Sequence, residues 1–129
     1  MTTARARASE TTVFKGRVAE DRAIAFLVDQ GYVVVARNVR CRGGEIDVVA
    51  TDGDTLCFVE VRSRASRRYG SAGATVDARK QARVTRAATH YLARLSTPAP
   101  RCRFDVVTLD GGVDDVSIAL VKDAFRVAT

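Results

Sequence analysis

Residues 44–64 read GEIDVVATDGDTLCFVEVRSR, in which two β-rich runs, Ile46–Thr51 and Leu56–Val61, flank an Asp-Gly-Asp turn. A short turn of this kind between two such runs predicts a β-hairpin. A type II′ turn has Gly at its first central position, so Gly53 and Asp54 are expected to form the two-residue loop. This turn fixes which residues of the two strands face each other.

In that register Asp47 lies directly opposite Glu60, and Glu45 lies opposite Arg62. Because side chains alternate along strands, all four share one face of the hairpin. The other face is expected to belong to the core and carries Ile46, Val48, Val59 and Val61. Two carboxylates in opposite positions repel each other and destabilise a sheet unless a cation lies between them. The hairpin therefore suggests a divalent-metal site.

The length and composition favour one globular domain. A chain of 129 residues can build one core but not two, so a single domain is expected over residues 12–129, behind a flexible tail at residues 1–11. The fractions of 47% apolar and 28% charged residues are ordinary for a soluble protein. No apolar run approaches the roughly 20 residues that span a bilayer, and the N-terminus lacks the apolar core of a signal peptide. We therefore expect no membrane partner and a cytoplasmic location.

The chain is basic, with a net charge of +6 and a pI of about 9.8, which favours a polyanionic partner. Basic residues bracket the acidic pair along the sequence. The candidates for nucleic-acid binding are Arg40, Arg42, Arg64, Arg67, Arg68 and Lys80. Two interpretations stay open for them, a solvated basic surface and a phosphate-binding rim.

Two helices are expected. The first runs from about Thr12 to Gln30 and ends at Gly31, and Glu20 lies in the middle of its apolar or small stripe. A carboxylate there either forms a buried salt bridge or belongs to a site. The second runs from about Asp77 to Leu95, with Thr75 or Asp77 as its N-cap. Lys80 in its first turn points towards the sheet, where it either holds a phosphate or a carboxylate or is an ordinary surface lysine.

Further strands complete an α-β-β-β-α-β-β order. Tyr32–Ala36 is an apolar run that predicts a first strand, nearly buried on both faces. Arg37–Gly44 is expected to be a polar loop and Ser63–Thr75 a mobile loop. Arg103–Leu109 and about Asp115–Leu120 predict two more strands. This order favours a mixed α/β fold, with helices flanking a mixed sheet.

The acidic pair suits phosphodiester hydrolysis. Hard oxygen ligands on adjacent strands can hold Mg²⁺ or Mn²⁺, which lowers the pKa of a bound water and neutralises phosphate charge. Arg62, two residues beyond Glu60, points into the same space and can stabilise that charge. Glu20 is a candidate for a further ligand, direct or through water. The predicted catalytic set is Glu20, Asp47, Glu60 and Arg62, and the three acids are the predicted metal ligands.

Several motifs of the chain resemble the YraN-like family, uncharacterised protein family 0102. They are Gly16…Ala19-Glu20, Arg37-Asn38-x-Arg40, Gly44-Glu45-Ile46-Asp47, Phe58-Val59-Glu60-Val61-Arg62-x-Arg64, Tyr69-Gly70, Lys80 and Arg103-Phe104-Asp105-Val106. The resemblance covers about residues 12–125. It implies a restriction-endonuclease-like α-β-β-β-α-β core, close to archaeal Holliday junction resolvases, and a DNA substrate that is branched or junction-like. In the wider PD-(D/E)xK nuclease superfamily the matching positions make Asp47 and Glu60 metal ligands, with Glu20 as the acid from the first helix. Resolvase-like relatives act as dimers, which leaves a homodimer open.

One position departs from the superfamily pattern, which ends in Lys where this chain has Arg62. Arginine stays protonated and cannot act as a general base, although its planar fork matches a phosphate well. The sequence is therefore compatible with a metal-dependent endonuclease that carries a different cation, and with a module of the same fold that binds nucleic acid without cutting it. A protein-interaction scaffold with no nucleic-acid partner is the third reading.

Overall fold

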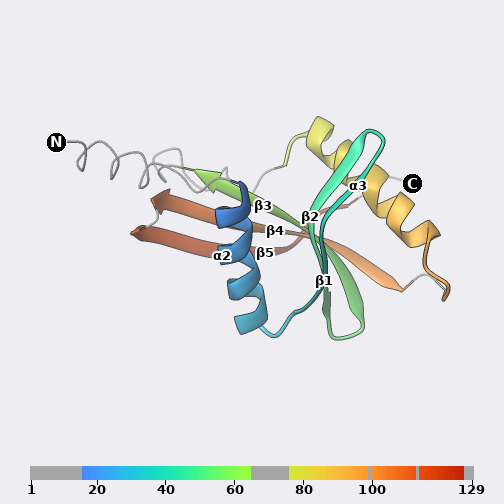
Figure 1. Ribbon diagram of the computed structural model, residues 1–129, viewed down its shortest axis with the longest axis horizontal. Helices are drawn as coiled ribbons and strands as arrows, with labels where there is room; N and C mark the ends of the chain where they lie inside the picture. Colours follow the sequence, from blue (N-terminus) through green and yellow to red (C-terminus); the bar gives the residue numbers. More distant parts are fainter. Residues whose placement is uncertain (1–15, 65–75, 99, 113, 127–129) are drawn as a thin grey trace.

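The computed structural model describes residues 16–64, 76–98, 100–112 and 114–126. The helices are α2 (Gly16–Asp29) and α3 (Ala78–Ala93), and the strands are β1 (Val33–Cys41), β2 (Gly44–Asp52), β3 (Thr55–Arg64), β4 (Arg101–Gly112) and β5 (Asp115–Phe125). The strands form one sheet in the order β1-β2-β3-β4-β5, antiparallel except for the parallel pair β3 and β4 (Figure 1). The predicted mixed α/β fold and the order of its elements are confirmed.

The central hairpin has the predicted register. Val48 pairs with Val59 and Asp52 pairs with Thr55, which leaves two residues for the loop. Gly53, the first of these, has a φ of +64°, the left-handed value that a type II′ turn requires at this position. Both strands extend beyond the predicted apolar runs, because their polar ends still pair with neighbouring strands.

The first strand differs from the prediction in length and in burial. β1 continues through the expected polar loop to Cys41 and pairs with β2 along its whole length. It is an edge strand, and Val33 and Val35 are 64% and 50% exposed instead of buried. The prediction was wrong because an apolar run does not reveal whether a strand has one neighbour or two, and an edge strand tolerates polar residues.

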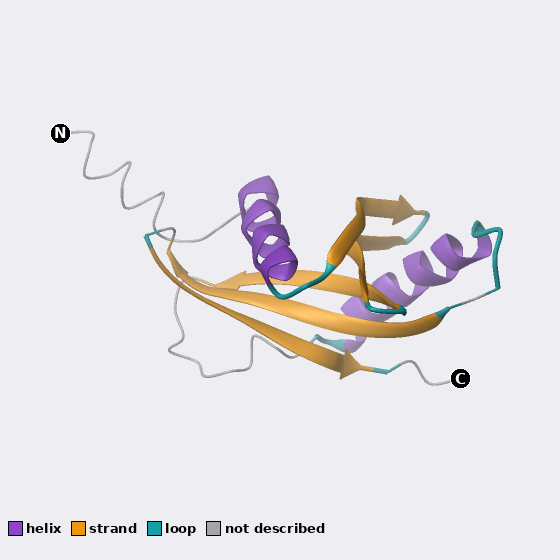
Figure 2. Ribbon diagram, turned by 90° about the horizontal axis from the view of Figure 1, so that it is seen from below, coloured by secondary structure: helices purple, strands orange, loops and turns teal. Residues whose placement is uncertain are grey.

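Two apolar clusters occupy opposite faces of the sheet. Val48 and Val59 pack with α2, whereas Val49 and Phe58, which alternate with them, pack with α3. α2 and α3 lie over different parts of the sheet, and the outer part of the β1–β2 hairpin bends away from the longer strands (Figure 2). The expectation that Ile46 shares the face of Val48 is wrong, because Ile46 packs with the α3 cluster.

The bend explains the placement of Ile46. The β2–β3 ladder ends at the Val48–Val59 pair, so residues before it pair with β1 alone. This end of β2 lies so close to α3 that a Cβ at Gly44 would be 2.8 Å from backbone atoms of Arg83 and Ala87. Two-stranded ribbons twist more strongly than larger sheets. The local twist therefore turns Ile46 towards the helix.

Both helices have the predicted kind of terminus. The side chain of Asp77 accepts a hydrogen bond from the Lys80 amide of α3 at 2.8 Å, so Asp77 is the N-cap. Gly31 follows α2 with a φ of +96° and donates its amide to Val28 O, as in a Gly-terminated helix.

The expected tail at residues 1–11 and most of the expected mobile loop lie outside the described residues. In the part of the chain that the structure describes, no helix is long and apolar enough to cross a membrane.

Candidate functional site

The carboxyl groups of Asp47 and Glu60 lie at the point where β2 and β3 separate. They occupy the next position after the last ladder pair, Val48 and Val59. Instead of a further backbone bond, the amide of Val61 donates to Asp47 Oδ2 at 2.9 Å. This bond holds the Asp47 carboxylate against β3, and the two carboxyl groups are close enough for each to perturb the pKa of the other. The predicted juxtaposition of the two acids is therefore present.

Glu60 is the more deeply buried acid, with 1% of its surface exposed. Its Oε2 atom accepts no well-directed hydrogen bond within the described part of the protein, although the Lys80 ammonium lies 3.2 Å away. Burying a carboxylate costs free energy unless a cation or several donors compensate for the lost water. Lys80 is half-exposed and supplies only part of this compensation.

The pKa values of both acids are raised, and burial is the largest cause in each case. The pKa of Glu60 rises to about 8, because the nearby Asp47 charge adds to burial and outweighs the Lys80 charge. The pKa of Asp47 is raised less far, since the Val61 amide and Lys80 favour its ionised form. Burial and the mutual repulsion of the two groups therefore favour their neutral forms, unless a cation binds between them.

Lys80 reaches this pair from the first turn of α3. The sequence left two roles open for it, and its ammonium group contacts the Glu60 carboxylate rather than projecting only into solvent. This contact places a cation next to the acids that comes from a helix and not from the strand motif. Any metal ion at the pair would share Glu60 with this ammonium group.

Glu20 of α2 is bound by side chains of β1. Its Oε1 atom accepts hydrogen bonds from Asn38 Nδ2 at 3.0 Å and from an Arg37 Nη atom at 3.4 Å. Asn38 has a φ of +54°, which is uncommon for a residue other than Gly and orients its amide towards α2. The charge of Glu20 is close enough to raise the pKa of Asp47. Direct ligation by Glu20 stays a prediction.

The other predicted residues are arranged differently. Arg64 forms an ion pair with Asp110 at 3.0 Å, and Glu45 pairs with Arg83 at 3.3 Å. Arg40 and Arg42 are exposed near the tip of the β1–β2 hairpin. Arg62 is half-buried and, by alternation along β3, lies on the side of Glu60. Arg67 and Arg68 lie outside the described residues.

The two carboxylates, Asp47 and Glu60, fit Mg²⁺ or Mn²⁺ as a pair of oxygen ligands. No group of three or more acidic, His or Cys side chains that could hold a metal occurs among the described residues. Mg²⁺, however, is usually held by one or two carboxylates and completes its octahedron with water and substrate phosphate. Within the described residues the buried Oε2 of Glu60 accepts no well-directed hydrogen bond, so it is available as a ligand to such an ion.

The sequence did not predict a second charged cluster, which surrounds Asp105 on β4. Asp105 is fully buried and accepts hydrogen bonds from the Tyr32 hydroxyl at 2.7 Å, from Arg103 at 2.8 Å and from the Asp123 amide at 2.9 Å. Arg103 also pairs with Asp52 at 2.8 Å. The sequence signal for this cluster was an acidic residue, Asp105, within the apolar run of β4. These donors compensate the charge of Asp105 and occupy both of its carboxylate oxygens. The cluster therefore links strands and offers no open position to a metal ion.

Comparison with known proteins gives a family. A model of "Uncharacterised protein family UPF0102" matches residues 19–109, which include the acids, Lys80 and most of β4. The chain belongs to the UPF0102 family. This UPF0102 protein is 50% identical over 112 residues to the UPF0102 protein STH1475 of Symbiobacterium thermophilum, covering 86% of this chain and 95% of that relative.

Two further relatives support the assignment. A UPF0102 protein of Cupriavidus metallidurans is 55% identical over 109 residues, covering 83% of this chain and 80% of the relative. The UPF0102 protein Nmul_A0195 of Nitrosospira multiformis is 49% identical over 117 residues, covering 91% of this chain and 97% of the relative. The resemblance found in the sequence motifs is thereby confirmed at the level of the family. The name of the family states no activity.

Proposed function

We propose that this UPF0102 protein is a metal-dependent endonuclease that hydrolyses phosphodiester bonds of nucleic acid. The observation that carries the proposal is the buried pair of carboxyl groups, Asp47 and Glu60, which come from adjacent strands and are only partly neutralised by Lys80. Carboxyl groups that perturb each other's pKa in this way are typical of functional sites. The basic charge of the chain supplies the attraction for a polyanionic substrate.

Each side chain has a defined task in this proposal. Asp47, fixed by the Val61 amide, and Glu60 would hold Mg²⁺ or Mn²⁺. When bound, such an ion supplies a water of lowered pKa and neutralises phosphate charge. Lys80 and Arg62 add positive charge beside the acids and orient the phosphate. Because Arg62 cannot accept a proton, the proton of the attacking water leaves to substrate phosphate or to bulk solvent.

The class of substrate is proposed from the family resemblance and from the basic charge of the chain. The resemblance to resolvase-like nucleases favours DNA, with branched or junction DNA as the first substrate to test. RNA offers the same phosphodiester group to Asp47 and Glu60 and is the second substrate to test. A homodimer would match the twofold symmetry of a junction, and this also belongs to the proposal.

A second candidate is a nucleic-acid-binding module of the same fold without catalysis. The Lys80–Glu60 contact favours it, because the ammonium group already supplies a cation to the more buried acid. In this case Glu60 and Lys80 form a structural ion pair, and Mn²⁺ does not change the affinity for nucleic acid. The two candidates therefore differ in metal binding.

The deciding experiment is cleavage of labelled linear and branched DNA by the purified chain with Mn²⁺, beside Asp47→Asn and Glu60→Gln. We expect cleavage by the native chain and a loss of at least roughly a hundredfold in both variants. Glu45→Gln is the matched control, because Glu45 is a more exposed acid of the same strand and pairs with Arg83. Cleavage that persists in both site variants would come from a contaminant and end the proposal. Salt-dependent binding without cleavage or metal binding would select the second candidate, and no binding at all would select a protein scaffold.

A further inference from the structure

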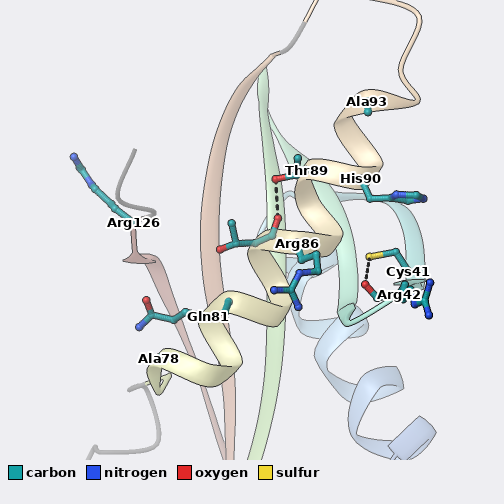
Figure 3. Close-up of a pocket in the computed structure, with 11 residues that line it drawn as sticks. Cys41, Arg42, Ala78, Gln81, Arg86, Thr89, His90, Ala93 and Arg126 are labelled. Carbon is teal, nitrogen blue, oxygen red and sulfur yellow. Dashed lines mark hydrogen bonds between the residues drawn. The ribbon is translucent and has the colours of Figure 1, made fainter.

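A groove runs along the outward side of α3, away from the sheet (Figure 3). Its cavity volume is about 870 Å³. One wall comes from the β1–β2 hairpin at Cys41 and Arg42, and Arg126 after β5 stands on the opposite side. The floor is the helix itself, from Ala78 in its first turn to Ala93 at its end. None of these residues belongs to the carboxylate pair.

Among the described residues, the groove is lined by basic side chains and by no acidic ones. The described residues that line it include Arg42, Arg86, Arg126 and His90, and none of them is Asp or Glu. Arg126 is neutralised by Asp123 at 2.8 Å. Arg86 donates to the carbonyl oxygen of Gly43 at 2.9 Å, and within the described residues no carboxylate pairs with Arg86 or Arg42. Two guanidinium groups without a carboxylate partner among the described residues therefore border the groove.

The floor permits close approach by a bulky anion. It consists mainly of small side chains, among them Ala78, Ala82, Thr85 and Ala93. At a rise of about 1.5 Å per residue, the helix from Ala78 to Ala93 spans roughly 22 Å, which is the length of several phosphates along one strand of a duplex. An apolar peptide partner would leave Arg42 and Arg86 buried without counter-charge, which is costly. The groove therefore suits a ligand that is long and negatively charged.

The groove and the acidic pair lie on different sides of α3. Lys80 extends from the helix to Glu60, whereas Gln81, the next residue, lines the groove near its beginning. A helix is about 10 Å across with its side chains, so a nucleic acid could contact both sides around the N-terminus of α3. Contacts in the groove would then position the ligand without taking part in chemistry.

We propose that this groove binds the phosphate backbone of nucleic acid, with Arg42 and Arg86 as the contacting residues. The proposal rests on the nucleic-acid part of the proposed function and adds a binding surface to it. Arginine forks bind phosphate oxygens through paired hydrogen bonds without reading the base sequence. The affinity contributed by the groove therefore depends on salt and not on sequence.

The test measures binding of fluorescein-labelled DNA, as single strand and as duplex of about 20 nucleotides, by anisotropy at several NaCl concentrations without metal. For the Arg42→Gln/Arg86→Gln double variant we expect affinity to fall roughly tenfold at low salt, and the slope of log K against log salt to fall by about 2. The matched control is Arg17→Gln/Arg101→Gln, which removes the same charge from exposed positions outside the groove. The control is expected to keep nearly the full slope.

Several outcomes would overturn the proposal. They are an equal loss in the groove and control variants, no loss in either, and competition by poly-glutamate as effective as competition by unlabelled DNA, which would assign the groove to acidic protein. Since Arg86 also contacts Gly43, the single Arg42→Gln variant is measured as well, and each variant is checked for an unchanged melting temperature. The nuclease proposal has a separate test, because it depends on metal binding at Asp47 and Glu60. We expect stabilisation by Mn²⁺ to persist in the groove variants.

Discussion

Glu60 is a buried acid whose surroundings favour its neutral form. Burial and the nearby Asp47 raise its pKa from 4.5 to about 8. Below pH 4.5 the group is protonated in both the folded and the unfolded chain, so its proton costs no stability there. As the pH rises towards 8, the unfolded chain ionises freely while the folded chain retains the proton. The folded state therefore loses stability across this window.

We predict that Glu60→Gln removes this loss. The difference in free energy of unfolding between the variant and the native chain should grow in favour of the variant by at most about 1.4 kcal/mol per pH unit between pH 5 and 8. Urea unfolding of the metal-free proteins at several pH values measures it. Glu45→Gln is the control, because its side chain is more exposed and is expected to give a constant difference. Parallel stability curves for Glu60→Gln and the native chain would contradict the raised pKa of Glu60.

At the scale of single elements, the hairpin was predictable and its surroundings were not. The register follows from a local rule, since a two-residue loop at Gly53 and Asp54 determines every pair up to Val48 and Val59. That rule also brings Asp47 next to Glu60. The length of β1 and the turned side chain of Ile46 depend on strand neighbours and on α3, which lie far away in the sequence. Local patterns carry no information on such contacts.

Gly44 illustrates a constraint that only packing reveals. An added Cβ would lie 2.8 Å from backbone atoms of Arg83 and Ala87, which cannot move without shifting α3. We predict that Gly44→Ala lowers the free energy of unfolding by about 2 kcal/mol and that Gly44→Leu lowers it further. Gly53 is the control, because its left-handed φ costs about 1 kcal/mol on substitution but open space surrounds it. At Gly53, Ala and Leu should therefore cost the same. Denaturant unfolding tests this, and equal costs of Ala and Leu at Gly44 would contradict the close approach.

The Asp105 cluster connects the loop after α2 with β4 and β5. The Tyr32 hydroxyl donates to Asp105 Oδ2 at 2.7 Å and also accepts a hydrogen bond from Arg103 at 2.9 Å. We predict that Tyr32→Phe costs about 1–2 kcal/mol in the free energy of unfolding, because a buried carboxylate loses a donor. Tyr91→Phe is the control, since Tyr91 contributes a ring contact to Phe58 but no hydroxyl hydrogen bond among the described residues, and it should change stability by less than about 0.5 kcal/mol. Similar costs for the two variants would show that the hydroxyl of Tyr32 contributes little.

At the scale of the whole molecule, the candidate site was only partly predictable. The acids could be paired from the sequence because one hairpin carries both. The contact of Lys80 with Glu60 joins residues from α3 and β3, so the sequence left its role open. The network around Asp105 links residues as far apart as Tyr32 and Asp123, and nothing local indicates that these segments meet. Sites within one hairpin are accessible to sequence reasoning, whereas sites that need the folded core are not.

Metal binding at Asp47 and Glu60 would be linked to the stability and the protonation of the whole chain. A ligand that binds only the folded state stabilises it, by about 2.7 kcal/mol at a hundredfold excess over Kd, which corresponds to roughly 10 °C in Tm for a chain of this size. Because the pKa of Glu60 is raised to about 8, an incoming ion has to displace a proton. The apparent affinity should therefore rise up to about tenfold per pH unit between pH 6 and 8.

We predict that Mn²⁺ raises the Tm more at pH 8 than at pH 6, and that the Asp47→Asn/Glu60→Gln double variant loses the effect at both pH values. Thermal unfolding with and without Mn²⁺ measures the shift, and removal of the metal with EDTA should reverse it. A shift that persists in the double variant would place the ion elsewhere. A shift of equal size at both pH values would mean that no proton is displaced, which contradicts a site built on Glu60. The absence of any shift would favour a structural ion pair, in which the Lys80 ammonium is the cation that these two acids require.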